Sequence, residues 1–184
     1  MKQKKSKKFI ILWIVVIAVC ILIGIRWFIV YRALQIKKKG PENWYSVTRD
    51  IYIDSFAEGW SGDNSDISPG EEYTDKSKKF GYYLVDLNGD GSDEFLVGYD
   101  DGTNPTVFSD IYVWHPDFGP LRIMQGAADV HYYLCSDKCI KEDVEWGANS
   151  STRYMKYNKD ETSFTIVESG GMPIKVELTY FTSD

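Results

Sequence analysis

The chain has 184 residues, of which 21 are Lys or Arg and 27 are Asp or Glu, a length that suits about one domain. The two signs are separated: ten basic residues and no acid lie in residues 1–40, so this head carries +10 and residues 41–184 carry −16. A body this acidic repels phosphate backbones, which excludes nucleic acid as a partner.

Residues 1–8 are a short basic tail, and residues 9–31 are an apolar run in which Arg26 is the only charged residue. A helix rises about 1.5 Å per residue, so this run is long enough to cross a hydrocarbon core about 30 Å thick. The sequence therefore predicts a transmembrane helix over 9–31, with the lipid bilayer as its partner. A cleaved signal peptide is the alternative, but its apolar region is normally about 7–15 residues long and ends in small residues.

Basic residues flank the predicted transmembrane helix on both sides, five in residues 1–8 and four in a juxtamembrane linker, residues 32–41. Segments rich in Lys and Arg stay on the cytoplasmic side, so the slightly larger number before the helix places the N-terminus inside. We therefore expect a single-pass protein of the cell membrane whose residues 42–184 form an extracytoplasmic domain.

The pattern of residues 42–184 predicts an α+β fold. A short amphipathic helix is expected over 42–58, with Trp44, Val47, Ile51 and Phe56 near one face. Short aromatic and β-branched runs separated by turn residues then predict an antiparallel β meander, arranged as a sandwich, a barrel or a blade-like sheet. These runs lie at about 80–86, 94–99, 107–114, 121–124, 130–135, 139–146, 152–158, 163–168 and 174–181.

The stretch "DLNGDGSDE", residues 86–94, separates two of these expected strands. Oxygen side chains at its first, third and fifth positions, a Gly at the sixth and a carbonyl at the seventh are typical of a loop that wraps Ca²⁺. The alternative is a plain hairpin turn in which the Asn-Gly and Asp-Gly pairs supply positive φ angles. A turn alone does not need four carboxylates, whose mutual repulsion a cation would relieve.

Residues 86–98, "DLNGDGSDEFLVG", resemble the calcium loop of the FG-GAP repeat, although its Phe-Gly and Gly-Ala-Pro elements are missing and only one copy occurs. The resemblance implies a β-hairpin that binds calcium, not a propeller, with the ligands Asp86, Asn88, Asp90, the Ser92 carbonyl and Glu94. Residues 42–168 also resemble small membrane-anchored or lipid-anchored proteins of Gram-positive bacteria, which implies a fold and a cellular location but no activity. Because calcium loops of extracellular modules bind at about 10⁻⁴–10⁻³ M, the site would fill outside a cell.

Two cysteines, Cys135 and Cys139, flank a three-residue turn, where facing strand positions come within disulfide reach. In an oxidising compartment they form a possible disulfide, and the alternative is a pair of free thiols. His131 precedes them at a spacing that zinc sites use, but the sequence supplies no evident fourth ligand.

These patterns favour a non-enzymatic surface module that binds an envelope protein or a glycan, or that takes part in envelope assembly. One alternative is a carboxylate-dependent cell-envelope hydrolase that uses acids of the loop after the helix, namely Asp63, Asp66, Glu71 or Glu72. Another is an accessory subunit that acts through its transmembrane helix. The aromatic residues, 15% of the chain, are either core or a binding surface, and the sequence does not separate these two roles.

Overall fold

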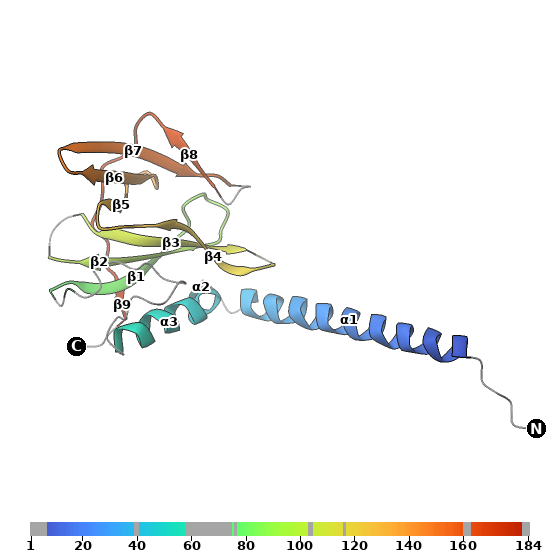
Figure 1. Cartoon of the computed structure of the whole chain (residues 1–184). Helices are drawn as coiled ribbons and strands as arrows, with labels where there is room; N and C mark the ends of the chain where they lie inside the picture. Colours follow the sequence, from blue (N-terminus) through green and yellow to red (C-terminus); the bar gives the residue numbers. More distant parts are fainter. Residues whose placement is uncertain are drawn as a thin grey trace, which may run out of the picture. The chain divides into compact units, whose positions relative to one another are not determined.

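The computed structural model describes residues 7–38, 41–57, 75, 77–102, 105–115, 117–159 and 163–181. The chain divides into two units, Met1–Gly40 and Pro41–Asp184, and the second begins one residue ahead of the predicted domain. This second unit has an α+β fold dominated by one antiparallel sheet, in agreement with the sequence pattern (Figure 1).

Among the described residues, nine strands build the sheet in the order β8-β7-β6-β5-β3-β2-β1-β9, and β4 pairs with β3 off this path. The first eight lie close to the runs predicted from alternation and turn residues, which confirms those predictions. The strands are β1 Lys79–Val85, β2 Glu94–Asp100, β3 Val107–His115, β4 Gly119–Gln125, β5 Val130–Leu134, β6 Ile140–Trp146, β7 Asn149–Tyr157, β8 Phe164–Val167 and β9 Thr179–Tyr180.

The ninth expected strand, 174–181, is wrong for most of its length, because only Thr179–Tyr180 joins the sheet ladder. Side chains of the segment before β9 do alternate between half-buried or buried and exposed. Its backbone groups, however, bond singly: Ile174 N donates to Leu134 O at 2.9 Å and Val176 N to the Thr106 hydroxyl at 3.0 Å. The alternating sequence pattern of this segment therefore indicated which side chains face the core, but it did not indicate pairing with a neighbouring strand.

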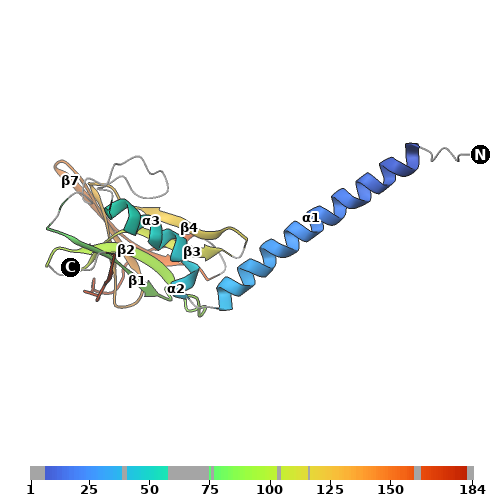
Figure 2. The same cartoon turned by 90° about the horizontal axis from the view of Figure 1, so that it is seen from below.

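The helix expected over 42–58 is two helices, α2 Pro41–Trp44 and α3 Ser46–Ala57, with a turn at Tyr45 between them. Figure 2 shows α3 lying across the face of β1, β2 and β3. The Tyr45 ring is buried and stacks on Phe95 of β2, with ring centroids 5.0 Å apart. The turn thus anchors the start of α3 to the beginning of β2.

The buried face of α3 agrees with the predicted one at Phe56 and differs from it at Val47. Val47 is exposed, whereas Thr48 and Tyr52 are buried. Phe56 continues the same stripe and stacks on Phe80 at 5.1 Å. Positions four apart lie on one face of a helix, so Thr48, Tyr52 and Phe56 form this stripe and the interruption at Tyr45 leaves Val47 outside it.

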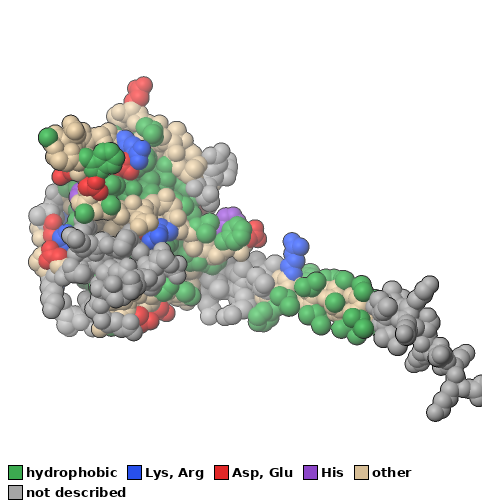
Figure 3. All heavy atoms as spheres, viewed as in Figure 1, with side chains coloured by type: hydrophobic (Ala, Val, Ile, Leu, Met, Phe, Trp, Pro, Cys, Tyr) green, Lys and Arg blue, Asp and Glu red, His purple; other side chains and the backbone are tan. Residues whose placement is uncertain are grey.

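Helix α1, Lys7–Lys38, covers the run predicted to cross a membrane. The side chains described between Trp13 and Phe28 are all exposed, and they are mostly hydrophobic (Figure 3). In the part of the chain that the structure describes, no helix has both the length and the hydropathy required to span a membrane.

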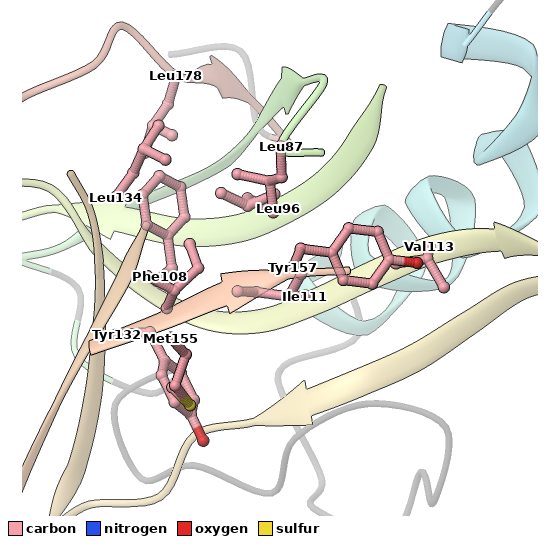
Figure 4. Packing of buried hydrophobic residues seen from close by; sticks show 11 residues of the cluster. Leu87, Leu96, Phe108, Ile111, Val113, Tyr132, Leu134, Met155, Tyr157 and Leu178 are labelled. Carbon is pink, nitrogen blue, oxygen red and sulfur yellow. The ribbon is translucent and has the colours of Figure 1, made fainter. Parts of the chain in front are cut away.

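The main core lies between the two halves of the sheet. Strand β3 meets β5 at only one residue pair, Phe108 opposite Tyr132, so the sheet bends there and its inner faces turn toward each other. Residues from both halves interlock in this core (Figure 4): Leu87, Leu96, Phe108, Ile111, Val113, Tyr132, Leu134, Ile140, Met155, Tyr157 and Leu178. Each fully buried side chain of this kind contributes about 1.5–3 kcal/mol, which makes the bend a main source of stability.

Candidate functional site

The acidic stretch, residues 86–94, connects β1 to β2 and ends on the first residue of β2. Gly89 and Gly91 have φ angles of 75° and 85°, a conformation that side-chain-bearing residues rarely adopt. The strands on either side pair in register from Lys79 opposite Asp100 to Val85 opposite Glu94. The predicted hairpin is therefore present, and its two glycines make the reversal.

Asp86 organises the turn through its carboxylate. Its Oδ1 accepts the backbone N–H groups of Gly89 at 2.7 Å and Asp90 at 3.1 Å, and its Oδ2 accepts that of Gly91 at 3.0 Å. Partial burial acts to raise the pKa of Asp86, but these donors and the charge of Lys138 outweigh it and hold the pKa below its usual range. A carboxylate offers about four acceptor positions, so these three bonds do not exhaust Asp86.

The middle of the loop continues this pattern. Asn88 donates to Asp90 Oδ2 at 3.2 Å, and the Asn88 side-chain oxygen accepts Asp90 N at 3.0 Å. The Ser92 N–H group donates to Asp90 Oδ1 at 2.7 Å. Four of the five predicted ligands, Asp86, Asn88, Asp90 and Ser92, are thus joined by short hydrogen bonds.

Glu94, the fifth predicted ligand, is 3% exposed and lies on the inner face of the sheet, which it shares with Leu96. Its Oε2 accepts the N–H group of Leu87 at 2.7 Å, which ties the start of β2 to the first turn of the loop. Burial is the main reason that its pKa rises to about 8; the bond from Leu87 opposes the rise, and the charges of Asp90 and Asp86 add to it. Glu94 therefore holds a proton near neutral pH.

Two lysines from distant turns contact the same loop. Lys138 Nζ donates to the Asp86 carbonyl at 2.6 Å, and Lys159 Nζ donates to the Gly89 carbonyl at 3.4 Å. Lys138 has a φ of 65°, an uncommon angle for a residue with a side chain. Sequence reasoning missed both contacts, because nothing in the local pattern signals a partner 52 or 70 residues away.

No group of three His, Cys, Asp or Glu side chains arranged to hold a metal ion occurs among the residues that the structure describes. The loop carboxylates are near enough to influence one another, since the charge of Asp86 also helps burial to raise the pKa of Asp93. Calcium binding stays a prediction.

Cys135 and Cys139 are free and buried. They close a tight turn, in which Cys135 N donates to Cys139 O at 2.9 Å and Lys138 N to Cys135 O at 2.9 Å. Burial, helped by the charge of Asp137, raises the pKa of Cys135 to about 11, so this thiol stays protonated at neutral pH. The turn also presents Lys138 to the acidic loop. That these two thiols join in a disulfide in an oxidising compartment stays a prediction.

A buried polar network joins α3 to the sheet. The Tyr52 hydroxyl donates to Asp110 Oδ2 at 2.5 Å and lies 3.1 Å from the Tyr112 hydroxyl. Asp110 is fully buried, and Arg122 Nη1 lies 3.8 Å from its Oδ1. A buried carboxylate is costly unless it is bonded in this way, so the network fixes where α3 docks.

A cavity of about 580 Å³ opens on the inner face of β5, β6 and β7, beyond the end of the core. We call it the β5–β7 groove and define it by Val130, Tyr132, Glu142, Val144, Trp146 and Arg153. Arg153 Nη2 donates to Glu142 Oε1 at 2.8 Å, and Nε contacts Oε2. Burial and the neighbouring Glu142 raise the pKa of Tyr132 to about 12, so its hydroxyl stays protonated. The sequence pattern predicted these strands but not this groove.

Asp63, Asp66, Glu71 and Glu72, the acids of the hydrolase alternative, lie outside the described residues. No family model, curated protein or solved structure that was compared with the chain matches it.

Proposed function

We propose that the protein is a single-pass, membrane-anchored module whose outward-facing domain binds calcium at residues 86–94 and serves binding or envelope assembly rather than catalysis. The proposal retains the N-terminus in the cytoplasm, the bilayer as one partner, and an envelope protein or glycan as the other. The FG-GAP-like character of the hairpin is part of this proposal.

The anchor is supported by the amino-acid sequence of residues 9–31 together with the helical state of α1. Its described hydrophobic side chains are exposed on every side of the helix. A helix that is apolar all round needs an apolar surrounding, either a protein core or a lipid. The basic residues at both ends suit anionic lipid headgroups.

Calcium binding is supported above all by one observation: Glu94 is buried within the electrostatic influence of Asp86 and Asp90. Burial and these like charges raise its pKa to about 8, and a divalent cation bound among the three would reverse that shift. Lys138 and Lys159 bring two positive charges to a loop with four carboxylates, which leaves the loop with excess negative charge.

The test is thermal melting of the full chain in dodecylphosphocholine micelles with increasing CaCl₂, with MgCl₂ for comparison. A site with a Kd of about 1 mM gives about 1.4 kcal/mol of stabilisation at about 10 mM Ca²⁺. For a domain of this size that energy raises Tm by about 3–6 °C. Asp86→Asn and Asp90→Asn should abolish the increase, whereas Asp54→Asn, a matched change at an exposed position of α3, should retain it.

Absence of a saturable calcium effect in the folded wild type would refute the metal site.

The orientation in the membrane is tested separately: protease added to intact cells should remove a tag at the C-terminus and spare one at the N-terminus. The reverse pattern would refute the outward orientation. Hydrolysis of envelope material that is lost on substituting Asp63, Asp66, Glu71 or Glu72 would favour the hydrolase alternative. Loss of function after exchange of residues 9–31 for another apolar run would favour the accessory subunit.

A further inference from the structure

The floor of the β5–β7 groove consists of rows of side chains that cross three strands. Tyr132, Glu142 and Arg153 pair across β5, β6 and β7 in one row. Val130, Val144 and Ser151 form the next row, and Trp146 pairs with Asn149 beyond it. Strands rise about 3.3 Å per residue, so the floor measures about 13 Å from Glu142 to Trp146.

The groove combines a polar end with an apolar floor. Glu142 is buried, whereas Trp146 is 69% exposed, which is unusual for the largest apolar side chain. Ser151 and Asn149 place a hydroxyl and an amide group along one side, and Gln125 lies on the other. A volume of about 580 Å³ falls within the range of ligand sites, which are mostly apolar with a few placed polar groups.

Charge narrows the class of ligand. Glu142 and Arg153 are the two charged lining residues of the groove, and they neutralise each other through two contacts. The domain around them carries −16, which repels anionic ligands at long range. The groove therefore offers no unbalanced charge to a charged ligand, but it offers many hydrogen-bonding groups to a neutral one.

We propose that the β5–β7 groove binds a neutral oligosaccharide, with a sugar ring stacked on Trp146 and hydroxyl groups bonded to the Glu142–Arg153 pair. This inference rests on the binding role proposed above and assigns it a site and a ligand class. A sugar ring has weakly positive C–H groups on its faces and hydroxyl groups at its rim. The electron-rich face of an indole attracts the C–H groups, and Ser151 and Asn149 suit the hydroxyl groups.

Glu142 also indicates binding rather than bond cleavage at this groove. A general acid or base must exchange a proton with its substrate. Glu142 is instead held by Arg153, whose pKa is raised chiefly by the hydrogen bond to Glu142. Both side-chain oxygens of Glu142 contact the Arg153 guanidinium, and a carboxylate held in a pair of this kind is a good acceptor for sugar hydroxyls.

The test is isothermal titration of the full chain in dodecylphosphocholine, a detergent without a sugar headgroup, with chitotetraose, cellotetraose and maltotetraose. We expect saturable binding of at least one of the three. Trp146→Ala should weaken it by roughly fivefold to tenfold, and Trp146→Phe should retain most of it. Phe118→Ala, which removes an aromatic ring that is 74% exposed beside β4, should leave binding unchanged.

Thermal melting of each variant checks that its fold is intact. Trp146→Ala should melt like the wild type, because an exposed Trp146 side chain contributes little to the core. Failure of all three oligosaccharides to bind overturns the inference, and so does equal weakening by Trp146→Ala and Phe118→Ala. Binding of an unstructured peptide at the groove in place of the sugars also overturns it. If the oligosaccharides do not bind but calcium still stabilises the protein, the groove proposal is refuted and the proposed function is not. The failure of one proposal can therefore be distinguished from the failure of the other.

Discussion

Replacing Glu94 by Gln should change how the stability of the protein depends on pH. The folded-state pKa of Glu94 is about 8, against 4.5 for the ordinary glutamate. Between these values the folded chain keeps a proton that the unfolded chain has released. The contribution of Glu94 to stability is therefore complete below about pH 4.5 and is lost progressively as the pH rises to about 8.

The difference between the two pKa values corresponds to about 5 kcal/mol across this pH range. Gln has no such proton, and its side-chain oxygen can still accept the N–H group of Leu87. We therefore expect Glu94→Gln to be close to wild type near pH 5 and more stable than wild type by a few kcal/mol above pH 8. Asp86, whose pKa is lowered, acts in the opposite direction and only in the acidic range.

The assay is urea unfolding of the full chain in micelles with EDTA, between about pH 5 and pH 9. Glu145→Gln, a matched change at an exposed position of β6, is the control and should reproduce the wild-type slope. Calcium should flatten the wild-type slope, because a bound cation favours the ionised Glu94. Equal pH slopes for wild type and Glu94→Gln in EDTA would refute the reasoning.

Two further predictions concern the sheet and the helix that covers it. Tyr52→Phe removes the hydroxyl that donates to the buried Asp110 at 2.5 Å, so it should lower the free energy of unfolding in urea by about 1–3 kcal/mol. The control Tyr180→Phe, at an exposed position, should leave that free energy almost unchanged. Equal effects of the two changes would contradict the network. Gly98→Ala places a methyl group against the Val107 carbonyl at the β2–β3 bulge and should lower the free energy of unfolding by more than about 2 kcal/mol. The control is Gly24→Ala, whose added methyl group meets nothing within 4 Å. An unchanged Tm for Gly98→Ala would contradict the close approach.

The sequence predicted the features that depend on neighbouring residues. Strand positions follow from alternation and turn chemistry, and Gly89 and Gly91 marked the hairpin because their φ angles are positive. Asp86, Asn88 and Asp90 also lie close together in the folded loop. Their hydrogen bonds join residues no more than five positions apart, so this arrangement depends on local sequence.

Features that depend on distant residues were beyond the sequence. Nothing near Lys138 indicates that its ammonium group meets Asp86, and nothing near Trp146 indicates that the bend at β3 leaves a groove beside it. Val47 was expected to face the sheet because apolar spacing gives a helix face, but the interruption at Tyr45 set a different face. Tertiary packing decided these cases, as it commonly does for short elements.

The position of Phe181 has a consequence for the order in which the chain becomes structured. This residue is buried against rings that lie far ahead of it in the sequence: its ring stacks on Tyr52 at 5.2 Å and on Phe56 at 6.0 Å. A chain emerging from a ribosome or a translocation channel makes α3 and β1 long before this ring exists. The aromatic face of α3 therefore stays incomplete until Phe181 has been added, and during that time its rings are exposed. A chain truncated just before Phe181 would keep these rings exposed.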